Sequence, residues 1–230
     1  MGRHLIPGTP PVPLTLRRSA RARRISLRVS GLDGQVTLTV PRGVSEAEAL
    51  GFARTKAEWL RGQLAARPDT VAVTPGAVLP IEGREWRIAC GAGRRVILAT
   101  DGTAHVPGPE EVLGRRLSAW LRTLARDRLA AASDAHAARL GRGYGRIVLR
   151  DTRSRWGSCS SRGTLSYSWR LILAPPEVLD YVAAHEVAHL AEMNHSPAFW
   201  AEVARLCPGY EQPRGWLRRQ GAALHRYRFD

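Results

Sequence analysis

The amino-acid sequence predicts an α+β fold, in which a β-rich N-terminal unit carrying one helix (residues 1–107) precedes a C-terminal domain with long helices (residues 108–230). Three observations support this prediction. Within the first hundred residues, several short segments alternate apolar and polar side chains, as half-buried strands do. Residues 107–109 are Pro-Gly-Pro, the strongest boundary signal in the chain. After this signal, apolar residues recur at helical spacing.

In the N-terminal part, residues 25–29 and 36–40 alternate around a Gly-Leu-Asp-Gly turn at 31–34, which predicts a β-hairpin. Ser45 and Glu48 form a capping box that opens a helix through Leu60. Glycines then separate three further short strands. We expect these strands at residues 78–81, 85–89 and 95–99.

In the C-terminal part, leucines at helical spacing predict a long helix over residues 110–139, ended by Gly141. Two strands are expected next, at 146–150 and 164–173. Pro176 and Glu177 suit the first turn of a following helix, because proline has no amide hydrogen to lose there and glutamate complements the helix dipole.

The composition is that of a globular protein, with 44% hydrophobic and 24% charged residues. Three cysteines without a CxxC pair argue against a disulfide framework and against a cysteine metal site. There is no convincing signal peptide and no apolar stretch of membrane-spanning length. We therefore expect a cytoplasmic protein with no membrane partner.

The formal charge of +15 is unusual, and arginines cluster at residues 17–28, 139–170 and 214–228. Such a charge attracts polyanions through long-range forces that salt weakens. It is compatible with non-specific nucleic-acid affinity. A solvated basic surface, with arginine favoured by the coding sequence, explains the same composition without a specific function.

The chemistry of the chain centres on the sequence His185-Glu186-Val187-Ala188-His189, an HExxH motif on the helix expected from Pro176. Side chains four residues apart project from one helix face, so the two imidazoles can bind a single zinc ion. Glu186 is offset around the helix and can reach a metal-activated water without binding the metal. A third ligand is needed, and His195 follows on a short turn, where Asn194 tolerates a left-handed conformation before Ser196-Pro197 opens the next helix.

Several segments together resemble the YgjP-like metallopeptidases, which are related to the SprT-like and wider zincin proteins. The resemblance rests on residues 155–160 (RWGSCS), 167–170 (YSWR), 185–189, 194–196 and 199–200. It implies a zincin-like catalytic domain that binds one Zn²⁺ through His185, His189 and His195. The spacing of the three histidines also occurs in metzincins and in bacterial rRNA-maturation endonucleases. The former carry glycine where this chain has Glu192, and the latter lack the glutamate found here at 186.

The expected function is zinc-dependent hydrolysis of a peptide or protein substrate, with Glu186 as general base. Tyr210 is a candidate for stabilising the tetrahedral intermediate, although packing at a helix junction explains it as well. Arg153 and Arg155 are candidates for binding a substrate carboxylate or phosphate, and Trp156 for a wall of the site or a core residue. Residues 156–160 and 167–173 form a possible edge to which a peptide could add as a strand.

Ligand histidines usually donate their second ring nitrogen to an acceptor, and Asp180, Glu192 and Glu202 are candidates. Cys159 is disfavoured as a nucleophile beside this motif. The other histidines lack ligand spacing; they are His4, His105, His136 and His225. Two alternative functions stay open: a metal-dependent nuclease, and a nucleic-acid-associated protease or binding protein.

Overall fold

The computed structural model describes residues 2–30, 34–65 and 69–230. The chain forms two compact units, Met1–Asp69 and Thr70–Asp230, each with its own buried core. The hydrophobic clusters of the two units share no residue. The units are described separately below.

The first unit is a four-stranded sheet with two helices. The strand order is β1-β2-β4-β3, with β2 and β4 parallel and the outer pairs antiparallel. The strands are β1 (Gly2–Ile6), β2 (Val12–Arg18), β3 (Ser26–Val29) and β4 (Val36–Val40), and the helices are α1 (Glu46–Thr55) and α2 (Ala57–Ala65). Alternate residues of β2 and β4 are buried and form the core with both helices.

The predicted hairpin is present as β3 and β4, while residues 31–33 of its turn lie outside the described residues. The Ser45 side chain caps α1 by accepting from the Glu48 amide at 3.1 Å. The single predicted helix is divided at Lys56, which leaves the helical conformation. The sequence analysis predicted neither β1 nor β2. Pro13 lies within β2, where it is opposite Leu5 of β1, and pairing with β4 begins only at Leu14.

The second unit contains a four-stranded sheet of order β6-β7-β9-β8. Its strands are β6 (Val78–Ile81), β7 (Arg84–Gly91), β8 (Ile97–Leu98) and β9 (Thr103–Pro107). β5 (Val71–Ala72) pairs in parallel with β13 (Tyr227–Arg228), near the C-terminus. The segment that starts this unit is thus tied to the segment that ends it.

The division between units lies at 69/70 and not at the predicted 107/108. The reason is shared burial: Ile88 and Val106 of the sheet lie in the same core cluster as Leu113 of the long helix. The Pro-Gly-Pro segment marks the turn from β9 into that helix within one core. A sequence signal for a turn is the same whether or not the hydrophobic core continues across it.

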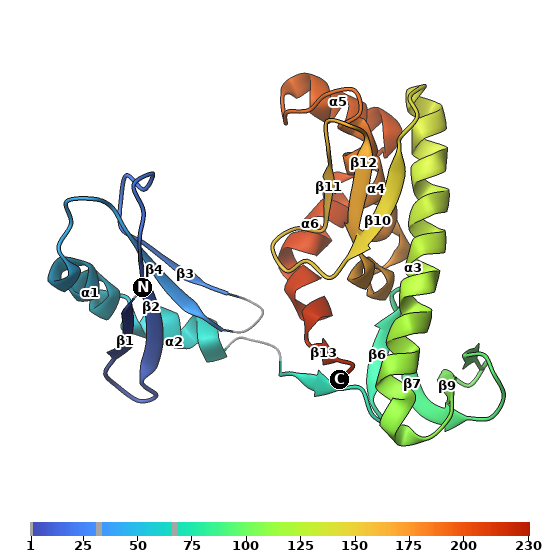
Figure 1. Cartoon of the computed structure of the whole chain (residues 1–230), viewed down its shortest axis with the longest axis horizontal. Coiled ribbons are helices and arrows are strands. Elements are labelled where there is room, and N and C mark those ends of the chain that lie inside the picture. The colour runs from blue at the N-terminus through green and yellow to red at the C-terminus, as the bar shows by residue number, and fades with distance from the viewer. Residues whose placement is uncertain (1, 31–33, 66–68) are drawn as a thin grey trace. The chain divides into compact units, whose positions relative to one another are not determined.

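The helix α3 (Glu110–Leu140) ends at Gly141, whose φ of 74° is the left-handed conformation expected after a helix. α3 packs along α4 (Pro176–Ala188) and beside β10 (Arg146–Arg150), as Figure 1 shows. β10 belongs to a three-stranded sheet of order β10-β12-β11, completed by β11 (Gly157–Cys159) and β12 (Thr164–Ser168). In this sheet β11 is an edge strand, and it lies against α4.

The strand predicted over residues 164–173 ends at Ser168, and a 3₁₀ helix, η1 (Trp169–Leu173), follows. Four of its five residues are buried. A strand would turn successive side chains to opposite faces, whereas a 3₁₀ helix brings this continuous apolar run into the core. The prediction failed because the run was long and apolar enough to suit either structure.

Three short elements complete the unit: α5 (Pro197–Leu206), α6 (Glu211–Gln220) and the 3₁₀ helix η2 (Gly221–His225). α4 is buried along most of its length and contacts both α5 and α6. Among the described residues, none of the helices has the length and apolar character needed to cross a bilayer.

Candidate metal centre

Three histidines gather where α4 meets α5. His185 lies in the last turn of α4, His189 follows directly as its C-cap, and His195 immediately precedes Ser196, the N-cap of α5. The Asn194 side chain accepts a hydrogen bond from the Ser196 amide at 3.0 Å and so shapes the turn. Asn194 does not adopt the predicted left-handed conformation, because this side-chain contact turns the chain instead.

The three imidazoles are close enough to share one ion. One ligand atom from each lies within 4.8 Å of the others, and His185 Nε2 is 3.1 Å from His195 Nε2. Two nitrogens bound tetrahedrally to one zinc at about 2.0–2.1 Å would stand about 3.3 Å apart. His189 is buried and His195 is exposed, so the cluster is fixed on one side and open on the other.

Phe199 of α5 packs against all three rings, with centroid separations of 4.9 Å to His185, 4.4 Å to His189 and 4.7 Å to His195. The phenyl ring is fully buried. A shared hydrophobic support restricts the imidazole rotamers before any ion binds. This ring links the fold of α5 to the geometry of the ligands.

The second ring nitrogens are held differently from the predicted arrangement. His189 Nδ1 lies 2.9 Å from the backbone carbonyl of Glu192, which leaves Nε2 for a metal. The carboxylates proposed for this role have other partners or take no part: Asp180 contacts His136 at 2.9 Å, and Glu202 pairs with Arg205 at 2.7 Å. A main-chain acceptor supplied by a turn leaves no residue-type signal in the sequence.

The ligand set fits a divalent metal. The buried His185 Nδ1 has no hydrogen-bond partner among the described residues, and burial, aided by the neighbouring His189, His195 and Arg214, lowers the pKa of His185 to about 3. A neutral imidazole presents a free lone pair, which a metal ion requires. Burial likewise lowers the pKa of His189.

Glu186 is 5% exposed and stands beside the histidines on α4. Its Oε2 has no hydrogen-bond partner among the described residues. Burial raises the pKa of Glu186 to about 8, opposed by the charge of Arg155 and by a hydrogen bond from the Cys159 backbone. A carboxylate in this state has one anchored side and one oxygen available for proton transfer.

Gly157 of β11 makes room for this carboxylate. A Cβ atom at position 157 would stand 2.5 Å from Glu186 Oε1 and 2.6 Å from Glu186 Cγ. Real Cβ atoms do not approach other atoms so closely, so any side chain here would displace the glutamate. The sequence analysis included Gly157 in the wall of the site but did not identify this role, because the contact joins elements far apart in the sequence.

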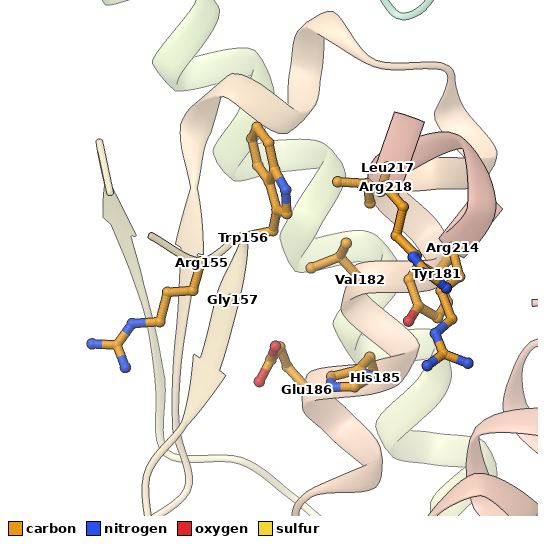
Figure 2. Close-up of a pocket in the computed structure, with 10 residues that line it drawn as sticks. All are labelled: Arg155, Trp156, Gly157, Tyr181, Val182, His185, Glu186, Arg214, Leu217 and Arg218. Atoms are coloured by element: carbon orange, nitrogen blue, oxygen red, sulfur yellow. The ribbon is translucent and has the colours of Figure 1, made fainter. Parts of the chain in front are cut away.

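A cavity of about 370 Å³ opens beside Glu186 and His185. Its apolar lining residues come from the start of β11 with the residue before it, from α4 and from α6 (Figure 2). Most of its charged lining residues are arginines. The full lining is Arg155, Trp156, Gly157, Tyr181, Val182, His185, Glu186, Arg214, Leu217 and Arg218.

The sequence analysis named Arg155 and Trp156 as candidate substrate contacts. Both residues line this cavity. The Trp156 ring is half-buried and packs against His225 at 5.1 Å, so it serves as wall and as packing residue. The Arg155 side chain extends away from Glu186 in Figure 2. Burial and the Glu186 charge raise the pKa of the Cys159 thiol, which disfavours a nucleophilic role as expected.

Tyr210 does not line the cavity. It stacks on Tyr181, with ring centroids 6.2 Å apart, and on Trp200, with ring centroids 5.4 Å apart. Tyr181 does line it, with its ring centroid 5.9 Å from that of His185. The position of Tyr181, four residues before His185 on one helix, was a signal that the sequence analysis overlooked.

Three imidazoles around one point, a buried carboxylate and an adjoining cavity are the features of a metal-dependent hydrolase. The sequence matches the family model "YgjP-like, metallopeptidase domain" over residues 23–220. The chain therefore belongs to the YgjP-like metallopeptidase family, as the resemblance implied, and family membership supports a hydrolase that binds a metal ion and acts on peptides.

A similar solved structure is the crystal structure of the metallopeptidase zymogen of Pyrococcus abyssi abylysin, with 25% identity and a TM-score of 0.34. The match covers 42% of this chain and 95% of that chain. No curated protein matches the sequence.

Proposed function

We propose that this protein is a zinc-dependent peptidase in which His185, His189 and His195 hold the ion and Glu186 is the general base. The observation that carries the proposal is the convergence of three ligand nitrogens beside a buried carboxylate with a free oxygen. Imidazole ligands suit several transition metals. Three protein ligands with an open fourth position are typical of catalytic zinc, and the described residues supply three.

When bound, zinc would polarise the scissile carbonyl and lower the pKa of water in its open position. Glu186 Oε2 takes the proton of the attacking water and later delivers it to the leaving amine. Burial makes the ionised carboxylate a stronger base, and a cation held by the histidines would favour that ionised form. The hydrogen bond from Cys159 holds the other side of the group in place.

The edge strand β11 provides a place for the peptide backbone. Among the described strands it pairs with β12 alone, so its other edge has backbone groups that can bind an extended chain. The Cys159 amide, which reaches Glu186, belongs to this strand. A peptide added there would lie next to the proposed base.

The test uses the full chain loaded with zinc and offered casein, a peptide library, structured RNA and DNA, each with and without a chelator. We expect chelator-sensitive cleavage of the protein or peptide substrates. Glu186→Gln should retain stoichiometric zinc, measured by mass spectrometry, and lose at least about 100-fold in kcat because proton transfer is lost.

Glu177→Gln is a matched control, because Glu177 lies on the same helix but is exposed and distant from the ligand turn. It should keep wild-type activity. Chelator-sensitive cleavage of RNA without cleavage of peptides would replace the peptidase with the nuclease alternative. Full turnover by Glu186→Gln would remove this residue from the mechanism.

A further inference from the structure

The side of the cavity formed by α6 is strongly basic. Arg214 and Arg218 lie four residues apart and therefore share one face of α6. Both line the cavity, together with Tyr181 and His185 of α4. Figure 2 shows the two arginine side chains next to Tyr181, across the cavity from Trp156 and Gly157.

Neither guanidinium has a carboxylate partner within 4.0 Å among the residues that the structure describes. Other arginines of this unit do form such pairs, as Arg170 does with Asp151 at 2.7 Å and Arg128 with Glu82 at 2.6 Å. Two unpaired like charges on one helix face repel each other. An anion bound between them would relieve this repulsion.

Arg214 is also held in place. Its guanidinium carbon lies 4.3 Å from the centroid of the Trp200 ring, and the side chain is half-buried. Stacking on an aromatic face limits the rotamers of arginine and leaves its edge free to donate hydrogen bonds. A fixed planar donor set of this kind suits a planar carboxylate.

The rest of the cavity suits a side chain that ends in such a carboxylate. Trp156, Val182 and Leu217 supply apolar surface for methylene groups. The space of about 370 Å³ reaches from this surface to Glu186. The same cavity thus holds cationic donors, apolar surface and the proposed base.

We infer that this cavity is a specificity subsite for a peptide carboxylate, held by Arg214 and Arg218. The inference rests on the proposed peptidase function and names its substrate class: peptides with an acidic side chain, or a free C-terminus, next to the scissile bond. Both sources present the same planar anion. A peptide is favoured over a polynucleotide because the arginines adjoin the base of a metallopeptidase-family site.

The experiment compares peptides with blocked ends that differ only in Glu or Gln at one position near the scissile bond. Wild-type zinc-loaded protein should cleave the Glu peptide with at least about 10-fold higher kcat/KM, since hydrogen bonds between ionised groups are stronger than those between neutral groups. Arg214→Gln combined with Arg218→Gln should reduce the ratio to about one. A Gln peptide with a free or an amidated C-terminus tests the terminal carboxylate.

Arg219→Gln is the matched control, because Arg219 lies on the same helix, is exposed and does not line the cavity. It removes one charge from the same surface and should keep the Glu preference. Equal preference loss in Arg219→Gln would show a general charge effect and overturn the subsite. Unchanged melting temperature and zinc content exclude unfolding as the cause.

A binding measurement separates this inference from the proposed function. Labelled Glu and Gln peptides are titrated onto the Glu186→Gln protein, which should not cleave them. Tighter binding of the Glu peptide that depends on Arg214 supports the subsite even if the wild type cleaves no peptide. Equal affinity for all peptides, or displacement by single-stranded RNA with no Glu preference, would overturn it.

Discussion

At the residue scale, the close approach of Gly157 to Glu186 requires glycine at position 157. Glycine leaves the space that the Glu186 side chain occupies, and the methyl group of an alanine would collide with that side chain. We predict that Gly157→Ala lowers kcat by about 10- to 100-fold, because small displacements of a catalytic group are costly. Zinc content should stay unchanged, since the three atoms nearest to an added Cβ all belong to Glu186, which is not a proposed ligand.

Gly143→Ala controls for this change. A Cβ atom at position 143 meets nothing within 4 Å, and the backbone there is not left-handed. Its activity should equal that of the wild type. Wild-type kcat in Gly157→Ala would mean that Glu186 has room to shift without consequence.

Tyr181 and Tyr210 offer a second comparison between single residues. A hydroxyl can stabilise the developing oxyanion only from within reach of the reacting carbonyl. Because Tyr181 lines the cavity and Tyr210 does not, we predict that Tyr181→Phe lowers kcat by about 10-fold or more. Tyr210→Phe should have the smaller effect, and the opposite order would restore Tyr210 as the oxyanion-stabilising group.

At the element scale, η2 supports the wall of the cavity through His225, which packs against Trp156. Burial lowers the pKa of His225 from its ordinary 6.5 to about 4, and the charge of Arg170 adds to this effect. A group whose folded-state pKa is depressed loses its stabilising contribution as the pH falls from 6.5 towards 4, since the unfolded chain then binds the proton more readily.

The corresponding prediction compares His225→Phe with the wild type by thermal unfolding. Between pH 6.5 and 4, the wild-type melting temperature should fall more steeply than that of the variant, which keeps an aromatic ring beside Trp156 but cannot be protonated. Parallel pH profiles for the two proteins would show that His225 does not titrate in this window.

The elements also show the limits of local sequence signals. The capping residue Ser45, the terminating glycine Gly141 and the first-turn proline of α4 act on their own helix, so their effects were predictable. β2 and η1 were not predicted, because strand pairing and burial by distant elements overcame the local signal. The sequence predicted the helix of the metal ligands from local spacing alone.

At the scale of the whole molecule, separate cores allow the two units to respond differently to metal. Zinc that binds only the folded state stabilises it, by about 2.7 kcal/mol at a free concentration of 100 times Kd. We predict that zinc raises the unfolding temperature of unit 70–230 and leaves that of unit 1–69 unchanged. Differential scanning calorimetry with zinc or with chelator measures both transitions.

His195→Ala tests the source of this stabilisation. Its side chain is exposed, so its removal should cost little in the metal-free protein. The rise in unfolding temperature that zinc produces should be much smaller in this variant, because only two of the proposed ligands remain. A zinc-induced shift of wild-type size in His195→Ala would place the metal at other residues.

By itself, the sequence determined the three histidines, the glutamate beside them and the family to which they belong, because ligand spacing along one helix and one turn is a local property. Only the tertiary structure decided the neighbours of Glu186, the cavity that Arg214 and Arg218 line, and the unit that includes β6 to β9. These features arise where segments distant in the chain pack together. Burial and close approach depend on that packing, which has no local sequence pattern.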